Sequence, residues 1–163
     1  MKDFTIRIAV REDLLEILEI YETARTFMRQ TGNETQWGDH YPPQDLVEED
    51  MEKGQLYVAE QDGILQGVFM FVIGEDQTYA HIEEGAWLSG EKYGVIHRVA
   101  SAGKAHGLIP AVLSFCEEKI GHLRIDTHEK NQIMQHILQK NGFQKCGIIY
   151  TDNGTPRLAF EKL

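Results

Sequence analysis

The stretch that decides the fold reads Val95-Ile96-His97-Arg98-Val99-Ala100-Ser101-Ala102-Gly103-Lys104-Ala105-His106-Gly107-Leu108-Ile109. Its first half is rich in apolar and β-branched residues, and it predicts a core strand over 94–101. Two glycines follow, and a helical pattern of apolar residues begins at Leu108. Pro110 then falls in the first helical turn, where a missing N–H costs nothing. The chain therefore runs from a strand through a short glycine loop directly into a helix.

The loop between Gly103 and Ile109 is a candidate anion site. Such a loop leaves several backbone N–H groups unpaired at a helix N-terminus, where these donors and the helix dipole act together on an anion. Gly107 allows the backbone to approach a phosphate closely. The alternative is a plain connector, because the spacing matches neither a Walker loop nor a dinucleotide fingerprint. The rest of the chain must decide between the two.

Outward from this loop, hydrophobic periodicity predicts the remaining elements. The predicted strands are 4–9, 56–60, 64–73, 123–128, 144–150 and 157–162, and the predicted helices are 14–28, 43–54, 108–120 and 131–141. Two hairpin turns are indicated by Asp62-Gly63 and Asn153-Gly154, whereas 31–43 and most of 76–93 are expected to be loop. Antiparallel hairpins mixed with helical crossovers predict one α+β domain over 1–163, with a mixed, mostly antiparallel central sheet flanked by helices.

Composition excludes several classes of function. Sixteen Lys and Arg against 26 Asp and Glu give a formal net charge of −10, which would repel a nucleic-acid backbone. No apolar run reaches the roughly 18 residues of a membrane span, and the first residues lack the pattern of a signal peptide. Two cysteines, Cys116 and Cys146, are too few for a disulfide framework. We therefore expect a cytoplasmic protein with reduced thiols and neither a nucleic-acid nor a membrane partner.

The whole pattern resembles the GCN5-related N-acetyltransferase (GNAT) family. The resemblance is carried by the first strand with its long helix, the hairpin over 56–73, the strand, loop and helix over 97–113, and Asn131 followed by Gly142-Phe143. It covers nearly the whole length in element order. It implies an acyl-CoA N-acyltransferase-like fold that uses acetyl-CoA as co-substrate.

The family loop after the fourth strand reads Gln/Arg-x-x-Gly-x-Gly/Ala. The matching positions here are Lys104-Ala105-His106-Gly107-Leu108-Ile109. Gly107 fits, Lys104 keeps the charge, and Ile109 departs because a branched side chain replaces a small residue near the expected pyrophosphate. The pantetheine arm would pair with Val99 and its neighbours, in a gap where strands 97–101 and 123–128 splay. The resemblance thus implies cofactor contacts at Val99, Ala100, Ser101, Lys104, Ala105, His106, Gly107, Leu108, Ile109 and Asn131.

The implied reaction is acetyl transfer to a primary amine, of a small molecule or a protein amino terminus, by direct attack in a ternary complex. An amine with a pKa of about 10 must first lose a proton, whereas a thiol with a pKa of about 8.5 leaves with modest help. The base therefore matters more than the acid. Family members commonly place a Tyr seven residues after the Asn to protonate the thiolate, and here that position is Leu138. A backbone N–H on the Val99 strand is the expected oxyanion donor.

The candidates for the catalytic base are Glu83, Glu84, His97, Asp126 and His128. In the family, a carboxylate or a water relay from about the position of Glu83-Glu84 often serves, although this pair could simply be solvated. On an alternating strand, Val95, His97 and Val99 share one face, and Asp126 could orient His128 or make a structural hydrogen bond. Asp126 and His128 alone are too few ligands for a metal, so none is expected.

The acceptor is expected to meet Phe27, Trp37 and Tyr41, because aromatic rings with nearby carboxylates suit an amine. The alternative is that Phe27 and Trp37 only fix the first helix to the sheet. Family members often pair as homodimers, for which the closing hairpin could serve. Two other functions stay open: a non-catalytic CoA-binding sensor or interaction module of the same fold, and an unrelated α+β domain whose glycine loop is a connector.

Overall fold

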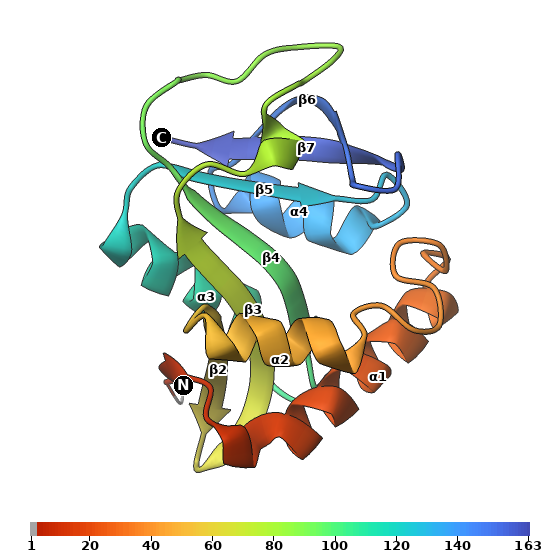
Figure 1. The fold of residues 1–163 in the computed structure, drawn as a ribbon, viewed down its shortest axis with the longest axis vertical. Coiled ribbons are helices and arrows are strands. Elements are labelled where there is room, and N and C mark those ends of the chain that lie inside the picture. Colours follow the sequence, from red (N-terminus) through yellow and green to blue (C-terminus); the bar gives the residue numbers. More distant parts are fainter. Residues whose placement is uncertain (1–2) are drawn as a thin grey trace.

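Seven strands form one sheet in the order β1-β2-β3-β4-β5-β7-β6 in the computed structural model, which describes residues 3–163 (Figure 1). The strands are β1 (Thr5–Ile8), β2 (Leu56–Gln61), β3 (Ile64–Ile73), β4 (Gly94–Ser101), β5 (Leu123–Thr127), β6 (Gln144–Tyr150) and β7 (Pro156–Lys162). The helices are α1 (Leu14–Gln30), α2 (Gln44–Glu52), α3 (Leu108–Lys119) and α4 (Gln132–Lys140), with short 3₁₀ turns η1 (Arg11–Asp13) and η2 (Gln77–Tyr79). The predicted order of elements is confirmed.

The pairing of the strands confirms a mixed, mostly antiparallel sheet. β4 and β5 are parallel, and every other neighbouring pair is antiparallel. The predicted turn between β2 and β3 has both central residues at positive φ, Asp62 at 55° and Gly63 at 78°. These angles match a type I′ turn, whose twist suits a two-residue hairpin.

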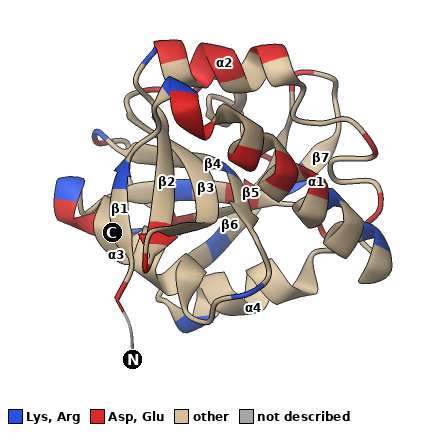
Figure 2. Ribbon diagram, turned by 90° about the horizontal axis from the view of Figure 1, so that it is seen from below, with Lys and Arg blue, Asp and Glu red and all other residues tan. Residues whose placement is uncertain are grey.

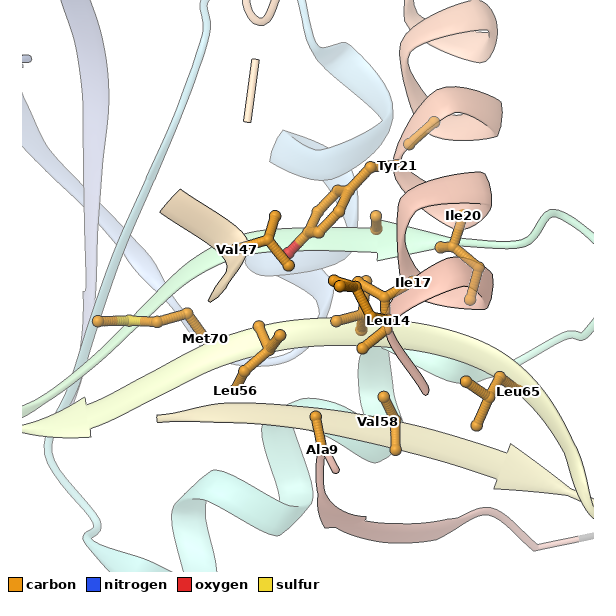
Figure 3. Close-up of a cluster of buried hydrophobic side chains, with 13 residues drawn as sticks. Ala9, Leu14, Ile17, Ile20, Tyr21, Val47, Leu56, Val58, Leu65 and Met70 are labelled. Atoms are coloured by element: carbon orange, nitrogen blue, oxygen red, sulfur yellow. The ribbon is translucent and has the colours of Figure 1, made fainter. Parts of the chain in front are cut away.

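Helices cover both faces of the sheet. On one face, Ile17 and Tyr21 of α1 and Val47 of α2 are fully buried against Leu56 and Met70 of β2 and β3 (Figure 3). This packing follows from the helical stripe of α1, which places one apolar side chain per turn toward the sheet.

The opposite face of the sheet is covered by α3 and α4. Leu113 and Cys116 of α3 and Leu138 of α4 are buried there against aromatic residues of the sheet such as Phe69 and Phe160. Both cysteines are free and buried. Burial raises the pKa of the Cys116 thiol to about 12, so this thiol stays protonated at neutral pH and acts as a small apolar side chain.

The segment between β3 and β4 is irregular apart from η2, as expected, but it is tied to the sheet. Glu83 forms an isolated bridge with Ile148 of β6. Trp87 and Tyr93 lie on the guanidinium of Arg124, at 4.1 and 4.0 Å from its carbon to the ring centroids. These contacts hold the segment across β5, β6 and β7.

Acidic residues gather on α1 and α2 at the surface (Figure 2). Among the described residues, no helix combines the length and the apolar composition needed to cross a membrane, and no group of three metal-ligating side chains is found in that same part of the chain.

Candidate functional site

β4 and β5 separate part-way along their length. They pair only from Gly94 with Leu123 to Ile96 with Ile125, and beyond this point Figure 1 shows the two strands diverging. Within residues 3–163, the backbone of β4 after Ile96 therefore has no strand partner on its β5 side. The predicted wedge in the sheet is present.

A bulge in β4 lies at the mouth of the wedge. His97 is opposite Met70 and Ala100 is opposite Val68, so Arg98 and Val99 share one position on β3. Arg98 has a φ of 53°, which is uncommon for a residue with a side chain. The bulge corrects the prediction of simple alternation, because Val99 packs with the core cluster of α3 and α4 and no longer shares a face with Val95.

Two buried contacts hold the bulge in place. The hydroxyl of Tyr21 on α1 donates to the Arg98 carbonyl at 2.9 Å. The Arg98 guanidinium donates twice to Asp50 of α2, through Nε and Nη2, each at 2.8 Å. Both helices on this face therefore fix the backbone at the point where the sheet opens.

A cavity of about 600 Å³ occupies this opening. Apolar and small polar residues line its side toward α4: Ile96, Val99, Ile125, Thr127, Asn131 and Met134. Aromatic and charged residues line the remaining wall: Trp37, Tyr41, Asp76, His97, Arg98, Asp126, Asp152 and Arg157. One continuous space thus connects the wedge with a charged chamber.

His97 lies between two carboxylates in this chamber. Its Nε2 is 2.6 Å from Asp76 Oδ2, and its Nδ1 is 3.7 Å from Asp126 Oδ2. The Tyr79 hydroxyl donates to the same Asp126 oxygen at 2.7 Å. Because a carboxylate only accepts, Asp76 fixes the proton on Nε2 and leaves Nδ1 as the ring nitrogen that can accept one.

The surroundings of His97 shift the pKa values of Asp76 and Tyr79 in opposite directions. Burial acts to raise the pKa of Asp76, but hydrogen bonds from His97 and Thr78 outweigh it and lower that pKa to about 2. Burial, together with the charge of Asp126, raises the pKa of Tyr79 well above its ordinary value. At neutral pH, Asp76 is therefore an anion and Tyr79 a neutral hydrogen-bond donor.

The loop before α3 presents a row of free amides. Within residues 3–163, Gly103 N–H donates to Ser101 Oγ at 2.9 Å, and no protein acceptor takes the N–H groups of residues 104 to 109. Gly107 begins the helix with a φ of 79° and has open space where a side chain would stand. These features fit a diphosphate, which needs several converging donors and a close approach to the backbone.

The departures from the family pattern fall in the core and not in the cavity. Ile109 packs against the buried cluster under α3, so its branched side chain leaves the free amides open. Leu138 is fully buried and does not line the cavity. Asn131 does line it, and its side chain caps α4 by accepting from Met134 N–H at 3.1 Å.

Several residues predicted to act in catalysis lie elsewhere. Glu83 and Glu84 are exposed and do not line the cavity, because the bridge to β6 directs their segment to the outer side of the sheet. Glu83 contacts His81 at 2.9 Å and the Tyr150 hydroxyl at 3.2 Å. The geometry therefore does not bring this pair to the chamber.

His128 does not meet Asp126, because β5 ends at Thr127 and the chain turns. Its Nδ1 accepts from Lys130 N–H at 3.0 Å, and its Nε2 faces Thr35 Oγ1 at 3.3 Å. Both ring nitrogens are thus engaged within the protein. Of the two alternatives, the oriented pair of Asp126 with His128 is not formed, and each side chain makes structural hydrogen bonds of its own. Burial and the charge of Arg157 lower the pKa of His128, which keeps the ring neutral.

Of the three residues predicted to meet the acceptor, two line the cavity and one does not. Trp37 and Tyr41 line the cavity, and the Trp37 ring also packs edge-on against Tyr21, with centroids 5.7 Å apart. Phe27 is 52% exposed and does not line the cavity; Met28, the next residue on α1, does. Successive side chains of an α-helix are rotated by about 100° about its axis, so Met28 faces the cavity where Phe27 does not.

Sequence reasoning missed Asp76 and Arg157. Asp76 precedes a short 3₁₀ turn and reaches His97 across 21 positions. Arg157 stands in the closing hairpin and reaches the carbonyl of Gln36 across 121 positions. Neither has a local motif that would mark it.

Comparison with known proteins agrees with this geometry. The chain is 34% identical to an acetyltransferase of the GNAT family from Streptococcus agalactiae, whose crystal structure matches with a TM-score of 0.89 over 98% of this chain and 95% of that one. A GNAT-family acetyltransferase from Listeria monocytogenes is 24% identical, with a TM-score of 0.71 over 98% of this chain and 94% of that one.

A ribosomal-protein-alanine N-acetyltransferase from Brucella melitensis shares the fold at 20% identity, with a TM-score of 0.60 over 98% of this chain and 99% of that one. No family sequence model and no curated protein sequence matches the chain. The identity to the Streptococcus agalactiae protein extends over nearly the whole of both chains. The protein therefore belongs to the GNAT family of acetyltransferases.

Proposed function

We propose that the protein transfers the acetyl group of acetyl-CoA to a primary amine by direct attack in a ternary complex. The observation that carries this proposal is the continuity of one cavity between two parts. One part is the wedge between β4 and β5 beside the free amides of residues 104 to 109. The other is the chamber that holds His97.

Acetyl-CoA would lie along the wedge. The amides of residues 104 to 109 and the N-terminus of α3 would hold its pyrophosphate. The unpaired side of β4 after Ile96 would accept the pantetheine arm as an extra strand. Asn131 and Val99 line the same space and would contact the arm. Bound in this way, the co-substrate supplies an activated thioester carbonyl at the mouth of the chamber.

His97 would take the proton from the amine. Nε2 is held by Asp76, so Nδ1 is free to accept a proton directly or through one water molecule. The negative charge of Asp76 and Asp126 would attract an ammonium ion to this point and stabilise the imidazolium that forms. Nucleophilic attack by the free amine then becomes feasible at neutral pH.

The backbone at the bulge would stabilise the developing oxyanion. Tyr21 and Asp50 hold this backbone rigid, and a fixed donor needs no reorganisation during the reaction. Leu138 stands at the family position of the Tyr that protonates the thiolate. Because a thiol is a good leaving group near neutral pH, the reaction can proceed with the thiolate leaving unassisted.

The test measures release of free CoA thiol from acetyl-CoA in the presence of a pool of primary amines. We expect turnover, and a loss of about 100-fold or more in kcat/KM in His97→Gln. Glu83→Gln is the matched control, since Glu83 is exposed outside the cavity, and it should behave as the parent protein does. Equal losses in both variants would contradict the role of His97.

Binding is measured separately by the melting temperature. Acetyl-CoA at saturating concentration should raise it, because a ligand that binds only the folded state stabilises that state. A rise without any thiol release would support a CoA-binding sensor in place of an enzyme. No rise at all would contradict the acetyl-CoA site.

A further inference from the structure

Arg157 differs from the other arginines of this chain. The sequence has seven arginines, all within residues 3–163. Six of them form an ion pair with a carboxylate: Arg7, Arg11, Arg25, Arg29, Arg98 and Arg124. In this described part of the chain, Arg157 has no carboxylate within 4.0 Å of it. That is unexpected in a protein with a net charge of −10.

The partners that Arg157 does have are neutral. Its Nη2 donates to the Gln36 carbonyl at 2.9 Å, and its Nη1 donates to the Pro156 carbonyl at 3.1 Å. A guanidinium has five N–H donors, so several remain. None of its side-chain nitrogens is both fully buried and without a hydrogen-bond partner, and the residue lines the cavity. The remaining donors are therefore available to a molecule inside the cavity.

An unpaired guanidinium at this depth is unfavourable. Arg157 is only 9% exposed, and burial lowers its pKa. A buried charge needs a counter-ion, and without one it destabilises the fold. Arg98 lines the same cavity but has Asp50 as its counter-ion. Arg157 thus lacks a counter-ion such as the one that Asp50 provides to Arg98.

The chamber contains groups of opposite charge. Asp76 and Asp126 face His97, and Arg157 lines the same cavity. The carboxylates beside His97 and the guanidinium of Arg157 therefore border one space that a small molecule can occupy. A molecule with an ammonium group and an anionic group would match this arrangement.

We propose that the acetyl acceptor is an amine that also carries a carboxylate, of the amino-acid class, and that Arg157 binds this carboxylate while the amine faces His97. This inference rests on the proposed acetyl transfer and specifies its substrate. The planar guanidinium fork matches a carboxylate in geometry and charge. Arg157 is thereby a specificity-determining residue of the acceptor site.

The first experiment uses the unaltered protein. Thiol release from acetyl-CoA is measured with each of the common amino acids and with its α-amide, and rates are referred to the concentration of unprotonated amine because amidation lowers the amine pKa. We expect at least one amino acid to exceed its amide by about 100-fold in kcat/KM, since a site with a buried donor rejects a ligand that leaves it unpaired.

The second experiment substitutes Arg157 and repeats the comparison. Arg157→Gln should lower kcat/KM for the preferred amino acid by about 30-fold or more and change the value for its amide by less than about threefold. Arg157→Lys should recover part of the loss, because it keeps the charge without the fork. Arg11→Gln is the control, since Arg11 is an exposed arginine whose ion pair lies on the surface.

Each outcome distinguishes the inference from the proposed function. Absence of thiol release with every amine would contradict acetyl transfer itself. Turnover with equal rates for acids and amides, or a greater preference for O-phosphoethanolamine than for any amino acid, would overturn the carboxylate assignment alone. Equal losses for acid and amide in Arg157→Gln would show that Arg157 only tethers Gln36, and would also overturn it.

Discussion

Asp50 of α2 and Arg98 of β4 meet in a buried, two-pronged ion pair, with both N–H···O distances at 2.8 Å. Asp50 is 3% exposed, and its partner is the residue with positive φ in the β4 bulge. The pair links a surface helix to the point where the sheet opens. It also supplies the charge balance that a buried guanidinium requires.

Removing Asp50 should therefore destabilise the protein strongly. We expect Asp50→Ala to lower the free energy of unfolding by about 3–5 kcal/mol, because the Arg98 charge stays buried without a partner. Glu48→Ala is the control, since it removes the exposed pair with Arg11, at 3.3 Å, and should lower it by less than about 1 kcal/mol. Urea denaturation measures both. Similar losses in the two variants would contradict the structural role given to the buried pair.

Gly107 and Gly63 allow the loop before α3 to be tested with a matched control. Their φ angles are 79° and 78°, and a side chain would meet no atom within 4 Å at either position. Aspartate should therefore strain both by about 1–2 kcal/mol. Only Gly107→Asp places a carboxylate beside the free amides, so only this variant should weaken acetyl-CoA binding, by tenfold or more.

Isothermal titration calorimetry measures the two affinities. An unchanged affinity in Gly107→Asp would mean that the pyrophosphate does not lie on this loop. An equal loss in Gly63→Asp, in the β2–β3 hairpin, would mean that backbone strain alone accounts for the effect.

Asp76 should make stability depend on acid pH. Its pKa is about 2 in the folded protein against an ordinary value of 3.8, so the unfolded chain takes up this proton first as the pH falls. Its contribution, on the order of 1–2 kcal/mol, is present above about pH 4 and is lost as the pH approaches 2. Urea unfolding at pH 5 and pH 2.5 should show a smaller acid-induced loss in Asp76→Asn than in the parent protein. Identical losses would argue against ionised Asp76 as the partner of His97.

Leu138→Tyr tests whether the family hydroxyl can be restored. Leu138 is fully buried, so a larger side chain with a hydroxyl must either overpack the core or leave a polar group unpaired. We expect a loss of about 2 kcal/mol or more in the free energy of unfolding and no increase in kcat. The melting temperature and the thiol assay measure the two effects. A faster and equally stable variant would show that this position can reach the leaving group.

The order and type of the helices and strands follow from local patterns in the sequence. The alternation over residues 4–9, the apolar stripe of α1 and turn residues such as Asp62-Gly63 are local signals, because each depends on the geometry of a few consecutive residues. The strand, glycine loop and helix over 94–109 are equally local. The candidate diphosphate loop could therefore be predicted from consecutive residues, whereas the wedge was implied by the resemblance to the GNAT family.

The set of side chains that meet in the cavity depends on the packing of segments far apart in the sequence. The β4 bulge shifts Val99 away from the face of Val95, and the end of β5 turns His128 away from Asp126, so alternation alone gave wrong neighbours. His97 acquires Asp76 from a loop, and Arg157 reaches Gln36 from the closing hairpin. These contacts depend on how distant segments pack, and local propensity contains no information about such packing. Hence the fold could be predicted from the sequence, whereas the choice of His97 among the five candidate bases and the identification of Arg157 required the folded chain.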